Sequence, residues 1–143
     1  MAYLAAIHTS KGFINKRIFH SMGGIPVDRF VNTIPAYEDA KYWLGQGGSL
    51  LIPPEGARSR DGSMLPFKNG AAKLSIESGV PIVPIKIEGN FEIFPRTKRL
   101  PKIFGLEGKY PIKILIGTPI VPNGYDVERL TQKIRKEIEN MEG

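Results

Sequence analysis

Residues 49–70 constrain the fold more than any other part of the chain, because an apolar stretch ends there and a charged loop begins. The apolar run from Leu50 to Ile52 predicts a short buried strand at 49–53, and the prolines at 53 and 54 bring it to an end. A cluster of charged and flexible residues follows: Glu55, Gly56, Arg58 and Arg60. Asn69 and Gly70 then open a predicted helix that stops at Gly79. In α/β proteins, a strand, a loop and a helix N-terminus in this order form binding sites at the carboxyl ends of strands.

The chemistry of this loop favours an anion. Guanidinium groups match phosphate oxygens, and the amides of a helix N-terminus also attract negative charge. Lys68 lies next to the start of the predicted helix and adds a further cation. We therefore predict a phosphate site with Arg58 as a ligand. The alternative is that Arg58 forms a structural ion pair with Glu55.

Strands and helices alternate along the rest of the chain. Strands are predicted at 25–27, 80–87 and 111–116, whereas residues 3–7 fit either a strand or the end of a helix. Helices are predicted at 13–22, from Pro35 to Gly47, and after Asp126, which can cap the last helix. Residues 91–109 show no clean period and predict a long loop. This alternation predicts an α/β fold, with a mostly parallel or mixed sheet flanked by helices.

A second charged pair, Asp28-Arg29, follows the predicted strand at 25–27. Parallel strands end at the same edge of a sheet, so this pair and the loop after residue 53 are expected on one rim. Pro26 places the strand at 25–27 at an edge of the sheet. We predict that Arg29 and Arg58 lie round one anion, with Arg60 as a third candidate.

Composition limits the remaining classes. A chain of 143 residues, 41% apolar and 24% charged, suits a single globular domain over residues 1–143. Without cysteine there are no disulfides or thiolate metal sites, and His8 and His20 lack the spacing of a metal pair, so no metal is expected. The net charge of +6 indicates an anionic partner, which could be nucleic acid, an acidic membrane or a phosphorylated substrate.

Three segments resemble motifs of the glycerolipid acyltransferases, the family that contains 1-acyl-glycerol-3-phosphate acyltransferase. Gly-Ile-Pro-Val-Asp-Arg at 24–29 resembles the second motif, Pro-Glu-Gly-Ala-Arg-Ser at 54–59 the third, and Val-Pro-Ile-Val-Pro at 80–84 the fourth. Residues 65–71 and 116–120 also fit the family. Each motif alone is weak, but their order and spacing make the resemblance specific, and it covers nearly the whole chain. Ala57 departs mildly from the usual threonine.

The first motif of that family, His-x-x-x-x-Asp, has no counterpart in this sequence. In the family the histidine acts as general base on the acceptor hydroxyl and the aspartate orients it. Here Phe13 lies five residues after His8, and Ile25 lies five residues after His20. The resemblance implies a glycerol-3-phosphate acyltransferase-like domain that is truncated at its N-terminus. Its catalytic residues are unknown, and whether this chain alone is an enzyme stays open.

The implied reaction belongs to phospholipid biosynthesis. An acyl group passes from acyl-CoA or acyl carrier protein, as co-substrate, to lysophosphatidic acid and gives phosphatidic acid. No bound cofactor is implied. By the resemblance Arg29, Arg58 and Lys68 hold the acceptor phosphate, while Glu55 and Gly56 position the acceptor. Glu55 would bond a glycerol hydroxyl or an arginine, or would serve only as a helix cap or loop salt bridge.

Two other functions are compatible with the same residues. A lysophospholipid-binding or phosphate-binding domain without catalysis would keep the anion site and lack the base. A basic nucleic-acid-binding domain would use the same net charge, but no nucleic-acid motif accompanies it, so a nucleic-acid partner is not expected.

Membrane contact is the last expectation from the sequence. Phe91, Phe94 and Phe104 are interleaved with cations at 96–102, which suits an anionic bilayer surface. The alternative is a solvated loop whose aromatic side chains face the protein core. No apolar stretch is long enough to cross a bilayer. We therefore expect peripheral attachment at the cytoplasmic face of a membrane.

Overall fold

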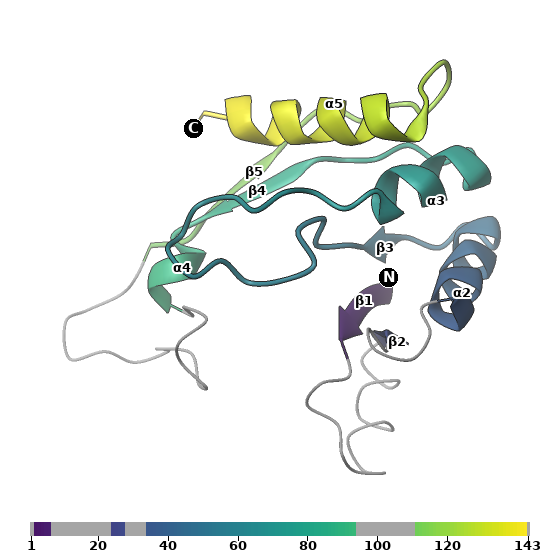
Figure 1. Cartoon of the computed structure of the whole chain (residues 1–143), viewed down its shortest axis with the longest axis horizontal. Coiled ribbons are helices and arrows are strands. Elements are labelled where there is room, and N and C mark those ends of the chain that lie inside the picture. Colours follow the sequence, from purple (N-terminus) through teal and green to yellow (C-terminus); the bar gives the residue numbers. More distant parts are fainter. Residues whose placement is uncertain (1, 7–23, 28–33, 94–110, 143) are drawn as a thin grey trace, which may run out of the picture.

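The computed structural model describes residues 2–6, 24–27, 34–93 and 111–142, and the descriptions below concern these ranges (Figure 1). In chain order the elements are β1 (Ala2–Ala6), β2 (Gly24–Val27), α2 (Ile34–Gly45), β3 (Leu50–Leu51), α3 (Gly70–Ser78), β4 (Ile85–Glu88), α4 (Asn90–Ile93), β5 (Lys113–Ile116) and α5 (Val127–Asn140). The predicted helix at 13–22 lies outside the described residues. Strands and helices alternate, so the structure confirms the predicted α/β class.

The strands form two sheets of different kinds. One is parallel with the order β2-β1-β3, and the other is the antiparallel pair β4-β5. The N-terminal segment left undecided by the sequence is therefore the central strand of the parallel sheet. Pro26 lies in the edge strand β2, opposite Ala5, as its missing amide requires.

Local signals set the ends of two helices as predicted. α3 ends at Gly79, whose φ of 67° is the left-handed conformation that glycine adopts without strain. α5 begins after Asp126, whose carboxylate accepts a hydrogen bond of 2.8 Å from the amide of Arg129. These caps fix the direction in which each helix leaves its loop.

The hydrophobic core lies where α5 packs against α3 (Figure 1). Leu130, Ile134 and Ile138 form the buried stripe of α5 and contact Ala72 of α3. The loop before α3 also reaches this core through Phe67, which is partly buried. One side of that loop is therefore anchored to the interior of the protein.

A polar cluster joins α2 to α3. Glu77 accepts from Lys41 at 3.0 Å and lies 3.8 Å from Lys73, and the Lys73 ammonium lies 5.0 Å from the centroid of the Tyr37 ring. Burial, followed by the neighbouring carboxylates Glu77 and Glu38, raises the pKa of Tyr37 to about 12. The cluster holds α2 against the helix that follows the charged loop.

Three predicted strands are shorter than the sequence pattern indicates. The strand predicted at 111–116 loses only its first two residues and forms β5. The strand predicted at 49–53 contains only the two residues of β3, which pair with β1. The strand predicted at 80–87 is divided into a single bridge between Ile82 and Ile120 and the separate strand β4. Between them Pro84, which has no amide, accepts a hydrogen bond of 2.9 Å from Gly117. The predicted loop at 91–109 overlaps α4, and its part from 94 onward lies outside the described residues.

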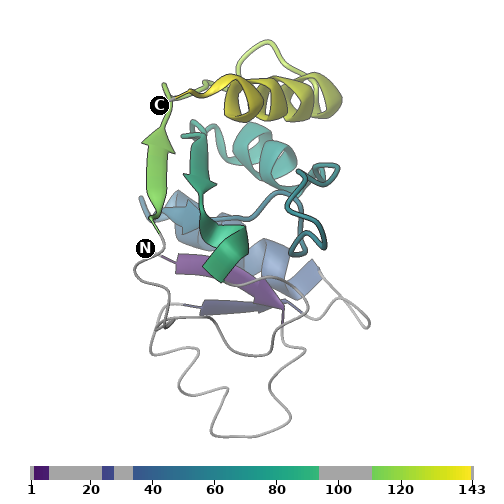
Figure 2. The same ribbon diagram turned by 90° about the vertical axis from the view of Figure 1, so that its left-hand side faces the viewer.

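One face of the β4-β5 pair consists of exposed isoleucines. Ile85 pairs with Ile116 and Ile87 with Ile114, and these four side chains are 36–70% exposed. Figure 2 shows the two strands side by side. On the opposite face the Lys86 ammonium donates to the carbonyl of Met141 at 2.7 Å. The C-terminal end of α5 therefore contacts one face of the pair and leaves the isoleucines uncovered.

Candidate functional site

The two strands that precede the charged segments are parallel to each other in the structure. β2 and β3 both run parallel to β1, with Val27 opposite Ala6 and Leu51 opposite Tyr3. The carboxyl ends of β2 and β3 consequently point in the same direction. Arg29 itself lies outside the described residues, so its closeness to Arg58 stays a prediction.

The loop at 53–69, called the anion loop below, is closed on itself by backbone contacts. The amide of Lys68 donates to the carbonyl of Pro54 at 2.9 Å, and the amide of Gly56 donates to the carbonyl of Pro53 at 3.2 Å. The first and last residues of the loop are thereby held side by side. The Gly56 amide therefore already has an acceptor within the loop.

Glu55 makes a contact that its sequence position did not reveal. Its carboxylate accepts a hydrogen bond of 2.8 Å from the amide of Leu65, ten residues further along. The side chain is half-buried between the two ends of the loop. This bond is neither a helix cap nor an ion pair, which were the structural alternatives for Glu55.

Gly56 and Lys68 are in direct contact. Gly56 has a φ of 65°, and a Cβ atom at this position would lie 3.1 Å from Cε and 3.3 Å from Nζ of Lys68. The lysine stem therefore passes over the glycine, and a larger residue would displace it. The structure brings three predicted site residues together: Glu55, Gly56 and Lys68.

Arg58 and Arg60 lie on the same loop, two and four residues beyond Gly56, and both are exposed. Their guanidinium groups are accessible to a ligand from solvent. The phosphate-binding role of Arg58 stays a prediction, like that of Lys68.

The tip of the anion loop is a tight polar turn that the sequence reading missed. Asp61 accepts from the hydroxyls of Ser63 at 2.6 Å and Ser59 at 2.9 Å, and from the Ser63 amide at 3.0 Å. These bonds, the Ser63 hydroxyl first, lower the pKa of Asp61 to about 2. The signal was present in the sequence, since Ser-Arg-Asp-Gly-Ser combines the residue types that form side-chain-stabilised turns.

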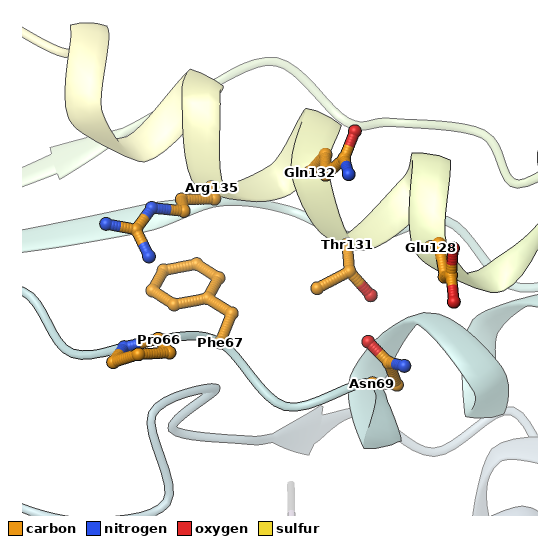
Figure 3. Close-up of a pocket in the computed structure, with 7 residues that line it drawn as sticks. All are labelled: Pro66, Phe67, Asn69, Glu128, Thr131, Gln132 and Arg135. Atoms are coloured by element: carbon orange, nitrogen blue, oxygen red, sulfur yellow. The ribbon is translucent and has the colours of Figure 1, made fainter.

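A cleft of about 340 Å³ separates the end of the anion loop from α5 (Figure 3). Its walls are Pro66, Phe67 and Asn69 on one side and Glu128, Thr131, Gln132 and Arg135 on the other. The Arg135 guanidinium lies 5.8 Å from the centroid of the Phe67 ring, and Arg135 Nε donates to Glu139 at 2.7 Å. No sequence pattern predicts this cleft, because its two walls are far apart in the chain.

Adjacent residues of the anion loop face different surroundings. Phe67 contacts the core and Arg135. Lys68 instead lies over Gly56 at the neck of the loop, where residues 54–56 meet residues 65–68. Packing of Phe67 thus restricts the backbone from which Lys68 extends. The arrangement presents a positioned cation at the neck and exposed guanidinium groups beyond it, which is suited to binding a phosphate.

Comparison with known proteins identifies the class. The profile of the family described as Acyltransferase matches residues 1–88, more than half of the 143 residues. The chain therefore belongs to the acyltransferase family, as the three sequence motifs predicted. The matched range contains the parallel sheet, the anion loop and α3.

Individual relatives agree with this assignment. The chain is 30% identical over 108 residues to the chloroplastic 1-acyl-sn-glycerol-3-phosphate acyltransferase of Brassica napus, covering 74% of this chain and 30% of that protein. It is 33% identical over 101 residues to the mouse 1-acyl-sn-glycerol-3-phosphate acyltransferase alpha, covering 68% of this chain and 34% of the mouse protein. The chain thus spans about a third of the length of these relatives.

A solved structure shares the fold. The crystal structure of the 1-acyl-sn-glycerophosphate acyltransferase of Thermotoga maritima matches with a TM-score of 0.71 and 23% sequence identity. The match covers 96% of this chain and 54% of the Thermotoga chain. The expected acyltransferase-like α/β fold is therefore confirmed, while the roles of single residues are untested by these comparisons.

Proposed function

We propose that this chain is the acceptor-binding part of a phospholipid-biosynthetic acyltransferase, and that the anion loop holds the phosphate of lysophosphatidic acid. The observation that carries the proposal is the closure of the loop at Pro54 and Lys68, which places the Lys68 side chain over Gly56, two residues before the exposed Arg58 in the chain. The names of the relatives, which are 1-acyl-sn-glycerol-3-phosphate acyltransferases, support the choice of acceptor.

In this proposal the three cations have distinct tasks. Arg58 and Arg29 each offer a planar fork that pairs with two phosphate oxygens, and Lys68 adds a point charge held by its packing. Together they fix the acceptor headgroup at the edge of the sheet. The free hydroxyl of the glycerol then attacks the thioester carbonyl of acyl-CoA or acyl carrier protein, forming the ester as the carbon–sulfur bond breaks.

An alcohol is a poor nucleophile near neutral pH, so a general base must take its proton during the attack. Residues 1–143 contain no His-x-x-x-x-Asp sequence. We therefore expect these residues alone to bind the acceptor with negligible acyl transfer. Turnover of lysophosphatidic acid and acyl-CoA by residues 1–143, at the rate of a family enzyme, would contradict this.

The proposal includes peripheral contact with the cytoplasmic face of an anionic membrane. The net charge of +6 supports it, because juxtaposed cations are attracted to acidic lipids. Among the residues that the structure describes, no helix combines the length and apolarity needed to cross a bilayer.

Lysophosphatidic acid binding by single variants tests the phosphate site. We expect Arg58→Ala and Lys68→Ala each to weaken binding at least tenfold, since a charged hydrogen bond contributes roughly 1.5–3 kcal/mol. Lys136→Ala, which removes an exposed cation from α5, is the control for net charge. Equal losses in all three variants would mean that only the overall charge matters.

A second function, a lysophospholipid-binding domain without catalysis, is favoured by the absent His-x-x-x-x-Asp sequence alone. It predicts the same binding, with no turnover in any longer form of the chain. A basic nucleic-acid-binding domain instead predicts tight DNA or RNA binding that falls steeply with salt.

A further inference from the structure

We propose that Glu55 is a positioning residue, whose carboxylate holds the amide of Leu65 and thereby determines where Lys68 lies. This differs from a direct contact between Glu55 and the glycerol hydroxyl or an arginine. The consequence for ligand binding depends on the proposed function, whereas the clamp itself depends only on the structure of the loop.

The clamp begins with one hydrogen bond across the neck of the anion loop. Glu55 Oε2 accepts a hydrogen bond from the Leu65 amide at 2.8 Å. The residue before it, Pro54, carries the second acceptor. The Pro54 carbonyl accepts from the Lys68 amide at 2.9 Å. Pro54 and Glu55, at the start of the loop, therefore hold Lys68 and Leu65, which lie three positions apart near its end.

The residues between these two bonds restrict the position of Lys68 further. Phe67 packs against the core and lies 5.8 Å from the Arg135 guanidinium, which anchors the segment from the other side. The Lys68 stem then lies over Gly56, close enough that a Cβ atom there would be 3.2 Å from Cδ. Loss of the bond from the Leu65 amide to Glu55 would release the start of the segment 65–68 and allow the Lys68 ammonium to move.

This role requires a hydrogen-bond acceptor and does not require negative charge. The side-chain oxygen of glutamine has the same reach and accepts the same bond from an amide. A carboxylate near a phosphate site also repels the ligand. The clamp therefore predicts that Glu55→Gln binds phosphate at least as tightly as the unmodified chain, and that Glu55→Ala binds more weakly.

Amide hydrogen exchange tests the clamp directly. In the full 143-residue chain we expect Glu55→Ala to speed exchange of the Leu65 amide at least tenfold, while Glu55→Gln leaves it within about twofold. Glu142→Ala removes an exposed carboxylate elsewhere and serves as the control. Unchanged exchange in Glu55→Ala, or equally fast exchange in both Glu55 variants, would overturn the clamp.

Ligand binding separates positioning from direct contact. With inorganic phosphate and with lysophosphatidic acid as probes, we expect several-fold weaker binding by Glu55→Ala and full binding by Glu55→Gln. Equal weakening in both variants, with the Leu65 amide still protected in Glu55→Gln, would show a charge-dependent contact and refute positioning. If the unmodified chain binds neither probe, the acceptor-binding function fails, and the exchange result alone decides the clamp.

Discussion

At the scale of single residues, Gly56 meets two requirements, which are a positive backbone φ and close approach of the Lys68 side chain. Its φ is 65°, and a Cβ atom here would lie 3.1–3.3 Å from three atoms of the Lys68 side chain, which would have to shift slightly. We expect Gly56→Ala to lower the free energy of unfolding by about 1–2 kcal/mol through backbone strain and to displace Lys68, weakening phosphate binding. Denaturant unfolding and a phosphate titration measure the two effects.

Gly124 provides a matched control for this substitution. Its φ is 81°, and nothing lies within 4 Å of the position a Cβ atom would take. Gly124→Ala should therefore lose similar stability and keep full phosphate binding. If both alanine variants bind phosphate normally, contact between Gly56 and Lys68 has no part in ligand positioning.

Asp61 gives a prediction about pH. Its pKa of about 2 in the folded chain is below the ordinary value of 3.8, so its bonds to Ser63 and Ser59 stabilise the folded state above about pH 4. This contribution should disappear as the pH falls from about 4 to about 2. Carboxyl chemical shifts during an acid titration measure it, with Asp61→Asn as the reference. A midpoint at the ordinary value would show that the turn does not hold the carboxylate.

The residues of the candidate site were predictable from the sequence, but the groups to which they form hydrogen bonds were not. Glu55, Gly56, Arg58 and Lys68 were selected because charge and flexibility after a strand indicate an anion site. The bond from Leu65 to Glu55 depends on how the loop returns, which no local pattern in the sequence encodes. The position of Arg29 stays a prediction.

At the scale of elements, the end of α3 and the start of α5 were predicted correctly, whereas the short helix α4 and the lengths of several strands were not. Asp126 and Gly79 act within one turn of their helices, so the sequence alone locates the start of α5 and the end of α3. The length of a strand depends on its partner instead. β3 pairs with β1 over two residues only, and Pro84 interrupts the strand predicted at 80–87.

The caps of α5 and α3 differ in a testable way. Asp126 accepts a hydrogen bond from the Arg129 amide, whereas Asn69 makes no side-chain cap bond. We expect Asp126→Ala to cost about 1 kcal/mol of stability, and Asn69→Ala to change it by a few tenths at most. Thermal unfolding of both variants measures the difference. Equal losses would mean that the Asp126 bond does not stabilise α5.

At the scale of the whole molecule, the uncovered isoleucine face on β4 and β5 should govern solution behaviour. Ile114 and Ile116 are 60% and 70% exposed, and they adjoin Ile85 and Ile87 on the same face. We expect the chain to self-associate as its concentration rises, because association would remove this exposed apolar patch from water. Sedimentation velocity over a range of concentrations measures the association.

Charged substitutions on this face supply the comparison. Ile114→Lys and Ile116→Lys should reduce association and leave the unfolding midpoint nearly unchanged, since both side chains are mostly in solvent. Tyr42→Lys, at a position 71% exposed on α2, is the control for added charge at a distant site. A chain that stays monomeric at every concentration would contradict the expectation.

The α/β class and the acyltransferase family were predictable from the whole sequence, because alternation and three ordered motifs are long-range patterns. The division into a parallel sheet and an antiparallel pair was not, since strand order depends on contacts between distant segments. The cleft beside α5 was missed for the same reason.

Mapping of lysophosphatidic acid onto the backbone amides, by chemical-shift changes in a titration below its micelle concentration, tests the phosphate site most directly. We expect saturable changes centred on residues 55–58 and 68–70, and their loss in the double variant Arg58→Ala, Lys68→Ala. Changes centred on Thr131 and Gln132 in the α5 cleft, or a double variant that binds as well as the unmodified chain, would contradict a phosphate site in the anion loop.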